Sequence, residues 1–149
     1  MPTLDEVRRE LDKDELDYPA LAGELGHEAL EQLHTLVTED EPRIASKAAY
    51  LAALIGGPTA DEVVGLAARS RHEAIRVSAA AALDKLPADQ GIEIAGRLLS
   101  DPDVGVRARA AKSAAKVEDP RIRELLSAMA ENDTHADVRE LAARLSMPT

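Results

Sequence analysis

Three cationic side chains are spaced so that one helix would display them together. In the stretch 101–117, Arg109, Lys112 and Lys116 follow one another at intervals of three and four residues. Residues at this spacing share one face of an α-helix, and Val106, which begins the apolar pattern of the stretch, falls on a different face. Because rows of cations bind carboxylates or phosphates, the spacing predicts a surface for an anionic partner.

No pattern in the sequence points to a catalytic site. There is no cysteine, no glycine-rich phosphate loop and no nucleophile elbow. Paired acids occur at Asp61-Glu62 and at Asp101 and Asp103, but both pairs stand at predicted helix starts, where capping and the helix dipole favour acidic residues. We therefore predict no catalytic residue, no metal site and no cofactor.

The charge is unevenly distributed along the chain. The protein has 149 residues and a net charge of −10; residues 1–42 hold 13 acidic side chains against three basic ones, and the remainder sums to zero. A hydrophobic content of 45% argues against a disordered acidic chain. The length suits a single domain, 1–149. Without a long apolar run or a signal-like N-terminus, we expect a soluble cytoplasmic protein.

The helices that carry the cationic residues can be predicted from an internal repeat in the sequence. Apolar residues recur 31 or 32 residues apart in several independent columns, and their spacing within each unit is helical. Self-similarity at such a period indicates a solenoid of helical repeats. Two of the columns are Ile44, Ile75, Val106 and Val138, and Leu33, Val64, Ala95 and Leu126.

Each unit is predicted to contain two helices joined by turns rich in Asp, Gly and Pro. The first helices are expected at about 28–38, 60–69, 90–99 and 121–131, and the second at about 43–56, 73–86, 103–117 and 136–146. Thr3 with Glu6 and Thr59 with Glu62 have the spacing of capping boxes. Residues 1–27 lack the repeat and are interpreted as an N-terminal helical cap. The predicted repeats are then 28–57, 58–87, 88–118 and 119–147.

The third repeat carries the residues of a known pattern. It has Asp101 in the turn between its helices, then Val106-Arg107, then Ala110-Ala111. This resembles the HEAT repeats of the short, phycobilisome-lyase-like type over about residues 28–147. The resemblance implies an all-α fold, a right-handed α-α superhelix of four helix pairs plus the N-terminal cap. The first repeat departs from the pattern because it has Ala45 where the others have arginine.

The resemblance also implies a structural role for part of the polar pattern. In the family, the turn aspartate and the following arginine commonly form a hydrogen-bonded ladder between repeats. Such a ladder would contain Arg76, Asp101, Arg107, Asp133 and Arg139. A phosphate-binding or catalytic arginine is the alternative interpretation of these residues.

Second helices usually line the concave surface of HEAT-like solenoids, so the columns around Arg109 are assigned to partner binding. Tyr50 is the expected anchor, since aromatic residues often dominate binding energy. Two alternatives remain: a solvated helix face, or coverage by the protein's own acidic segment, residues 12–17. The residues assigned to the concave face are Lys47, Tyr50, Ser78, Lys85, Arg109, Lys112, Lys116 and Arg144.

Two histidine–glutamate pairs need separate consideration as metal ligands. His27-Glu28 and His72-Glu73 are similar to the pairs by which HEAT-like deoxyhypusine hydroxylases hold two irons. Here the pairs are 45 residues apart, which is not a multiple of 31, so they would start helices of different kinds. His72 and His135 share a column two repeats apart, too far for one ion because packed helices are about 8–10 Å apart. We interpret these histidines as surface residues.

The favoured function is a non-catalytic protein–protein interaction scaffold or adaptor, with another protein or peptide, including an acidic one, as its partner. A nucleic-acid-binding HEAT-like protein is an alternative, which the net charge and the lack of stacking aromatic residues oppose. A HEAT-like enzyme, either a metal-dependent hydroxylase or a bilin-lyase-like protein, is a further alternative without supporting residues. The exposed ends of a solenoid would also permit a homodimer.

Overall fold

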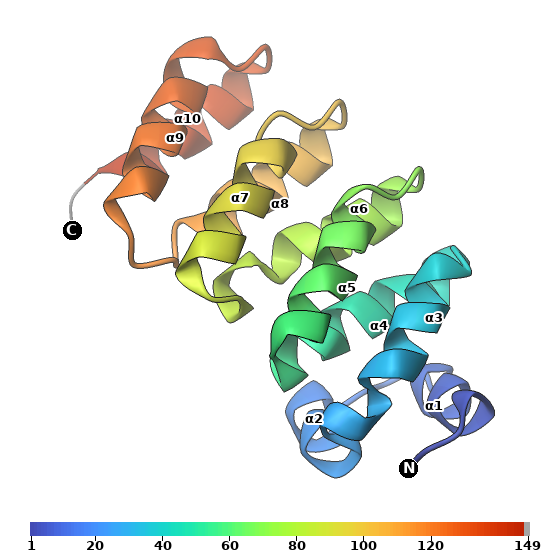
Figure 1. The fold of residues 1–149 in the computed structure, drawn as a ribbon. Helices are drawn as coiled ribbons and strands as arrows, with labels where there is room; N and C mark the ends of the chain where they lie inside the picture. Colours follow the sequence, from blue (N-terminus) through green and yellow to red (C-terminus); the bar gives the residue numbers. More distant parts are fainter. Residues whose placement is uncertain (148–149) are drawn as a thin grey trace.

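Alanine dominates the second helix of the first repeat. In α4 (Pro42–Ile55), Ala45, Ala48, Ala49 and Ala52 are fully buried. Alanine favours the helical state, and its small side chain lets neighbouring helices approach closely. The computed structural model, which describes residues 1–147, stacks such helices into a solenoid (Figure 1).

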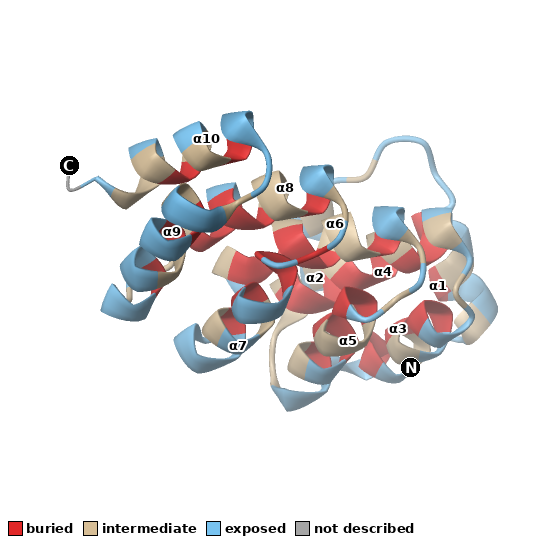
Figure 2. Ribbon diagram, turned by 90° about the horizontal axis from the view of Figure 1, so that it is seen from above, coloured by how far each residue is buried: buried red, intermediate tan, exposed pale blue. Residues whose placement is uncertain are grey.

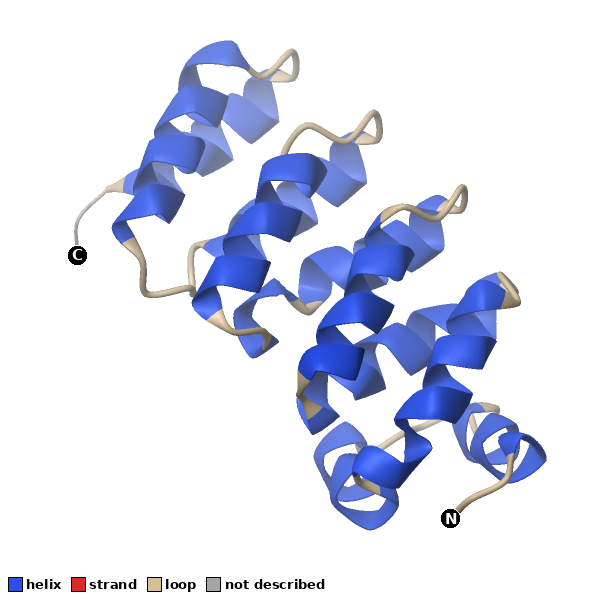
Figure 3. Ribbon diagram, in the orientation of Figure 1, coloured by secondary structure: helices blue, strands red, loops and turns tan. Residues whose placement is uncertain are grey.

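The described residues form helices joined by short turns, without any strand (Figure 3). Two helices, α1 (Leu4–Leu11) and α2 (Tyr18–Leu25), precede the repeats. The predicted all-α fold is confirmed. The four helix pairs are α3 (Leu30–Thr38) with α4, α5 (Pro58–Ala68) with α6 (Glu73–Ala81), α7 (Ala88–Leu98) with α8 (Val104–Ala114), and α9 (Pro120–Asn132) with α10 (Ala136–Ser146). Two short 3-10 helices are also present: η1 (His27–Ala29) directly precedes α3, and η2 (Leu83–Lys85) follows α6.

The repeats form two layers of helices. The first helices α3, α5, α7 and α9 make one layer, the second helices α4, α6, α8 and α10 make the other, and buried residues lie between them (Figures 1 and 2). Both predicted apolar columns lie in this core, and no member of either column is more than 7% exposed. No helix within residues 1–147 combines the length and the apolar character needed to cross a membrane.

The first helices are splayed more widely than the second. Open grooves of about 480 Å³ and 420 Å³ separate α5 from α7 and α7 from α9. The second-helix layer therefore lies on the inner side of the curve, as the resemblance to HEAT repeats implied. We call the exposed surface of α4, α6, α8 and α10 the inner face.

Three local predictions need correction. The helix predicted over 103–117 ends at Ala114, so Lys116 lies beyond α8. Thr59 and Glu62 do not form a capping box, because α5 already begins at Pro58 after Gly57, whose φ of +105° suits glycine. The helix predicted over 73–86 ends at Ala81 and continues as the 3-10 helix η2. Gly91 of α7 lies against η2: a Cβ at this position would stand 3.0 Å from the carbonyl oxygen of Leu83. A close contact with the next helix thus accompanies the change of helix type.

The N-terminal helices cover the first repeat. Val7 and Leu11 of α1 are fully buried, and α1 packs against both α3 and α4. The capping box of Thr3 and Glu6 starts this helix as predicted. Helix α2 packs against α4, with Leu21 buried. The cap therefore covers the first repeat, and part of this contact lies on the inner face.

Candidate interaction surface

A hydrogen-bonded ladder connects the turns of the last three repeats. Arg76 donates through Nε and Nη2 to the two carboxylate oxygens of Asp101, at 2.9 and 3.2 Å. Its Nη1 donates at 3.0 Å to the carbonyl oxygen of Ser70, in the turn of its own repeat. Because the guanidinium is planar, this bidentate contact fixes both distance and orientation between the second and third repeats.

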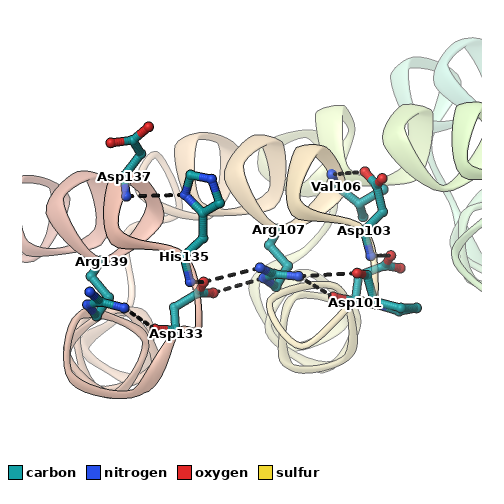
Figure 4. Close-up of polar contacts among 9 residues, drawn as sticks. Asp101, Asp103, Val106, Arg107, Asp133, His135, Asp137 and Arg139 are labelled. Carbon is teal, nitrogen blue, oxygen red and sulfur yellow. Dashed lines mark hydrogen bonds and ion pairs between the residues drawn. The ribbon is translucent and has the colours of Figure 1, made fainter.

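The same arrangement recurs one repeat later. Arg107 lies between Asp101 and Asp133 (Figure 4), and donates to both carboxylate oxygens of Asp133 at 2.9 and 3.2 Å and to the carbonyl oxygen of Asp101 at 3.0 Å. Burial by itself raises the pKa of Asp133, but hydrogen bonds from Arg107 and from the backbone N–H of His135, with the charge of Arg107, outweigh it. The net pKa lies below the ordinary value. Asp133 is therefore held as a charged carboxylate that pairs with Arg107.

The ladder differs at its two ends. Arg139 keeps the contact with its own turn, donating at 2.8 Å to the carbonyl oxygen of Asp133, but no carboxylate within residues 1–147 is paired with it. At the first interface Ala45 replaces the arginine, and Asp40 instead accepts from Ser70 Oγ and Arg71 Nε, both at 2.9 Å. The hydrogen bond from Ser70, ahead of the neighbouring charges, holds the pKa of Asp40 below its ordinary value.

Four of the eight residues assigned to the concave face already have partners within the protein. Lys47 Nζ donates at 2.9 Å to the carbonyl oxygens of Leu11, the last residue of α1, and of Lys13, two residues beyond it. Ser78 donates to the carbonyl oxygen of Ser46, and Lys85, on η2, lies 3.3 Å from the carboxylate of its neighbour, Asp84. The fourth is Tyr50, whose ring meets that of Tyr18 edge to face, with centroids 5.0 Å apart.

The other four assigned residues form a group that we call the basic row: Arg109, Lys112, Lys116 and Arg144. Arg109 is half-buried, whereas the other three are exposed. Within residues 1–147, none of their side chains forms an ion pair or a hydrogen bond with another residue. They belong to α8 and the residues that follow it, and to α10. The available cations therefore gather on the C-terminal half of the inner face.

Coverage of this face by the acidic segment 12–17 was one of the alternatives left open by the sequence, and the structure places part of that segment against the first repeat, although Arg43 was not among the assigned residues. Arg43, at the start of α4, forms an ion pair with Asp12 and lies 3.6 Å from Asp14 Oδ1. With Lys47, it attaches the acidic segment between α1 and α2 to the first repeat. A possible signal was the 31-residue separation of Asp12 and Arg43, but Asp12 belongs to the N-terminal cap, which lacks the repeat.

The histidines are dispersed over the solenoid. His72 Nε2 lies 3.4 Å from Asp40 Oδ2, and His34 Nε2 lies 4.0 Å from Glu62 Oε1. His27 lies beside Gly57. No cluster of three or more potential metal ligands occurs in the part of the chain that the structure describes.

Comparison with known proteins agrees with the observed packing. The profile for HEAT repeats matches residues 60–146. Among solved structures, the chain is similar to the complex of CpcE and CpcF of phycocyanin lyase from Nostoc sp. PCC7120, with a TM-score of 0.69 and 20% sequence identity. The similarity covers 87% of this chain and 86% of the other. No curated protein matches the sequence. With more than half of its length matched by the profile, this chain belongs to the HEAT-repeat family.

Proposed function

We propose that this protein is a non-catalytic protein–protein interaction module that holds its partner on the inner face. The observation that carries the proposal is the basic row. Arg76 and Arg107 form contacts between repeats, whereas none of the four side chains of the basic row has a partner within residues 1–147. Cations placed together without an internal carboxylate provide electrostatic complementarity for an acidic surface.

The surroundings of the basic row suit a protein partner. Val77 and Ala81 on α6 and Ala108 on α8 itself are partly exposed, so small apolar side chains accompany the charges. Protein interfaces combine such apolar surface with polar and charged groups at the rim. The similar structure from Nostoc is itself a complex of two proteins. On this basis, a second folded protein is the proposed partner.

The test is affinity capture with the purified full-length chain. The double variant Arg109→Glu/Lys112→Glu reverses two charges in the basic row, and we expect it to lose the partner that the wild type retains. Arg97→Glu/Arg123→Glu is the matched control, because both residues are exposed and unpaired within residues 1–147 but lie on first helices. Partner recovery unaffected by the basic-row variant would show that the proposed surface is wrong.

Nucleic acid is the second candidate, because the same four cations could contact phosphates. The net charge of −10 opposes that interpretation at long range. Binding to DNA or RNA that weakens steeply with salt, and that is lost in Arg109→Glu/Lys112→Glu, would favour it over a protein partner. Absence of binding at low salt would exclude it.

A further inference from the structure

The first repeat already binds an acidic segment on the inner face. Lys47 Nζ contacts the carbonyl oxygens of Leu11 and Lys13, both at 2.9 Å. One helical turn earlier, Arg43 donates to the side chain of Asp12 and, at 2.7 Å, to its carbonyl oxygen. Cations on α4 thus bind the backbone carbonyl groups at the C-terminal end of α1 and just after it, and the carboxylates of the acidic residues that follow.

The position of Lys47 is repeated along the solenoid. The register set by Ile44, Ile75, Val106 and Val138 places Lys47 in one column with Ser78, Arg109 and Leu141. Ser78 donates to the carbonyl oxygen of Ser46, and leucine carries no charge. Arg109 is therefore the cation that stands, two repeats later, where Lys47 stands in the first.

The environment of Arg109 extends this correspondence. Lys112 follows Arg109 at three residues on α8, Lys116 lies two residues after the end of α8, and Arg144 occupies the column of Lys112 on the next repeat. On the first repeat the corresponding column holds Tyr50, which Tyr18 of α2 partly covers. No residue of 1–147 pairs with the Arg109 side chain, so the donors that α4 uses internally remain available on α8.

We propose that the basic row binds an acidic peptide segment in the manner in which α4 binds residues 11–14. Arg109 donates to main-chain carbonyl oxygens of the segment, and Lys112, Lys116 and Arg144 pair with its carboxylates. The inference rests on the proposed function and specifies the partner: a protein that presents an acidic segment with accessible backbone carbonyls. The segment 11–17 of this chain, L-D-K-D-E-L-D, has the required composition.

The probe is a fluorescently labelled synthetic peptide with the sequence of residues 9–18, titrated into the full-length protein at low ionic strength. Fluorescence anisotropy should show binding that Arg109→Glu weakens about tenfold or more, whereas Arg109→Lys retains most of it because a cation and donor remain. The matched control Arg97→Glu should leave the affinity unchanged. A peptide in which every Asp and Glu is replaced by Asn and Gln should not bind.

Amide chemical shifts locate the bound peptide. We expect the largest changes on α8 and at Arg144, since the α4 position is occupied by the protein's own segment. Shifts confined to α4 would mean that the peptide replaces that segment, and would overturn the assignment to the basic row. An affinity unchanged in Arg109→Glu would do the same.

The two proposals fail in different ways. If the peptide does not bind while partner capture still depends on Arg109 and Lys112, the inner face is an interaction surface and the acidic-segment mode is wrong. If capture is indifferent to both residues, the proposed function itself is wrong.

Discussion

Arg107 of α8 donates to both carboxylate oxygens of Asp133, at 2.9 and 3.2 Å, and thereby attaches the third repeat to the turn of the fourth. Their side chains are only 12% and 4% exposed. Removing one member of a buried pair leaves the other charge without compensation. We expect Arg107→Ala to lower the free energy of unfolding by about 3 kcal/mol, measured by urea denaturation followed by circular dichroism.

The matched control for the ladder is Arg109→Ala, two residues away on the same helix. Arg109 makes no contact of this kind within residues 1–147, so its loss should change the unfolding free energy by about 0.5 kcal/mol or less. Equal destabilisation by the two variants would contradict the division into ladder and basic row.

A substitution at Ser113 should increase stability instead of decreasing it. Its side chain is 1% exposed and its hydroxyl has no hydrogen-bond partner. Because an unsatisfied buried hydroxyl is costly, Ser113→Ala should raise the unfolding free energy by up to about 1 kcal/mol. The reciprocal control is Ala82→Ser, in the same column of the preceding repeat, which should destabilise the protein. A marked loss of stability in Ser113→Ala would indicate that the hydroxyl is satisfied in solution.

The aromatic contact between Tyr18 and Tyr50 attaches the cap to the first repeat. An edge-to-face pair contributes about 0.5–1.5 kcal/mol beyond the apolar area that it buries. Tyr50→Ala should therefore accelerate amide hydrogen exchange in α2, and Tyr18→Ala should reproduce the effect, while α7 to α10 remain unchanged. Exchange in α2 that is identical in wild type and variants would show that the cap is held by its other contacts alone.

The pKa of Asp119, which caps α9, lies far below the ordinary value for an aspartate. Its pKa is lowered from 3.8 to about 2, first by the side-chain hydrogen bonds from Arg121 and then by the backbone N–H of Arg121. Because the folded-state pKa is depressed, the contribution of this carboxylate to stability is complete above about pH 4 and is lost as the pH falls toward 2.

A carbon-detected NMR titration of the Asp119 carboxyl group measures this shift directly. Arg121→Ala should raise the midpoint but not restore it fully, since the backbone donor of residue 121 persists. A midpoint near 3.8 in the wild-type protein would contradict the observed pairing.

The periodic part of the fold could be predicted because its cause is local. Apolar residues 31 or 32 positions apart must face the same layer in every repeat, and both columns are buried as predicted. The end of α6 could not be predicted in this way. The change to a 3-10 helix is accompanied by the close approach of Gly91 in α7 to the Leu83 carbonyl group, and the pattern of residues 73–86 carries no information about that neighbour.

The candidate site was likewise predictable only in part. The register places Lys47 and Arg109 in one column, but the two side chains have different surroundings in the structure. Lys47 contacts backbone atoms of residues 11 and 13, in a region that has no repeat and whose path depends on how α1 packs. Every residue has a backbone carbonyl group, so residue type does not reveal which carbonyl groups accept from a lysine. The sequence alone therefore could not show that Lys47 has internal partners and Arg109 has none within residues 1–147.

The packing of α2 against Tyr50 closes the inner face at its N-terminal end. A bound chain crossing α6, α8 and α10 would span two helix spacings, about 16–20 Å. An extended chain rises about 3.3 Å per residue, so this distance corresponds to about five or six residues. If the inner face binds a segment as proposed, the contact between Tyr18 and Tyr50 limits that segment to a length of about five or six residues.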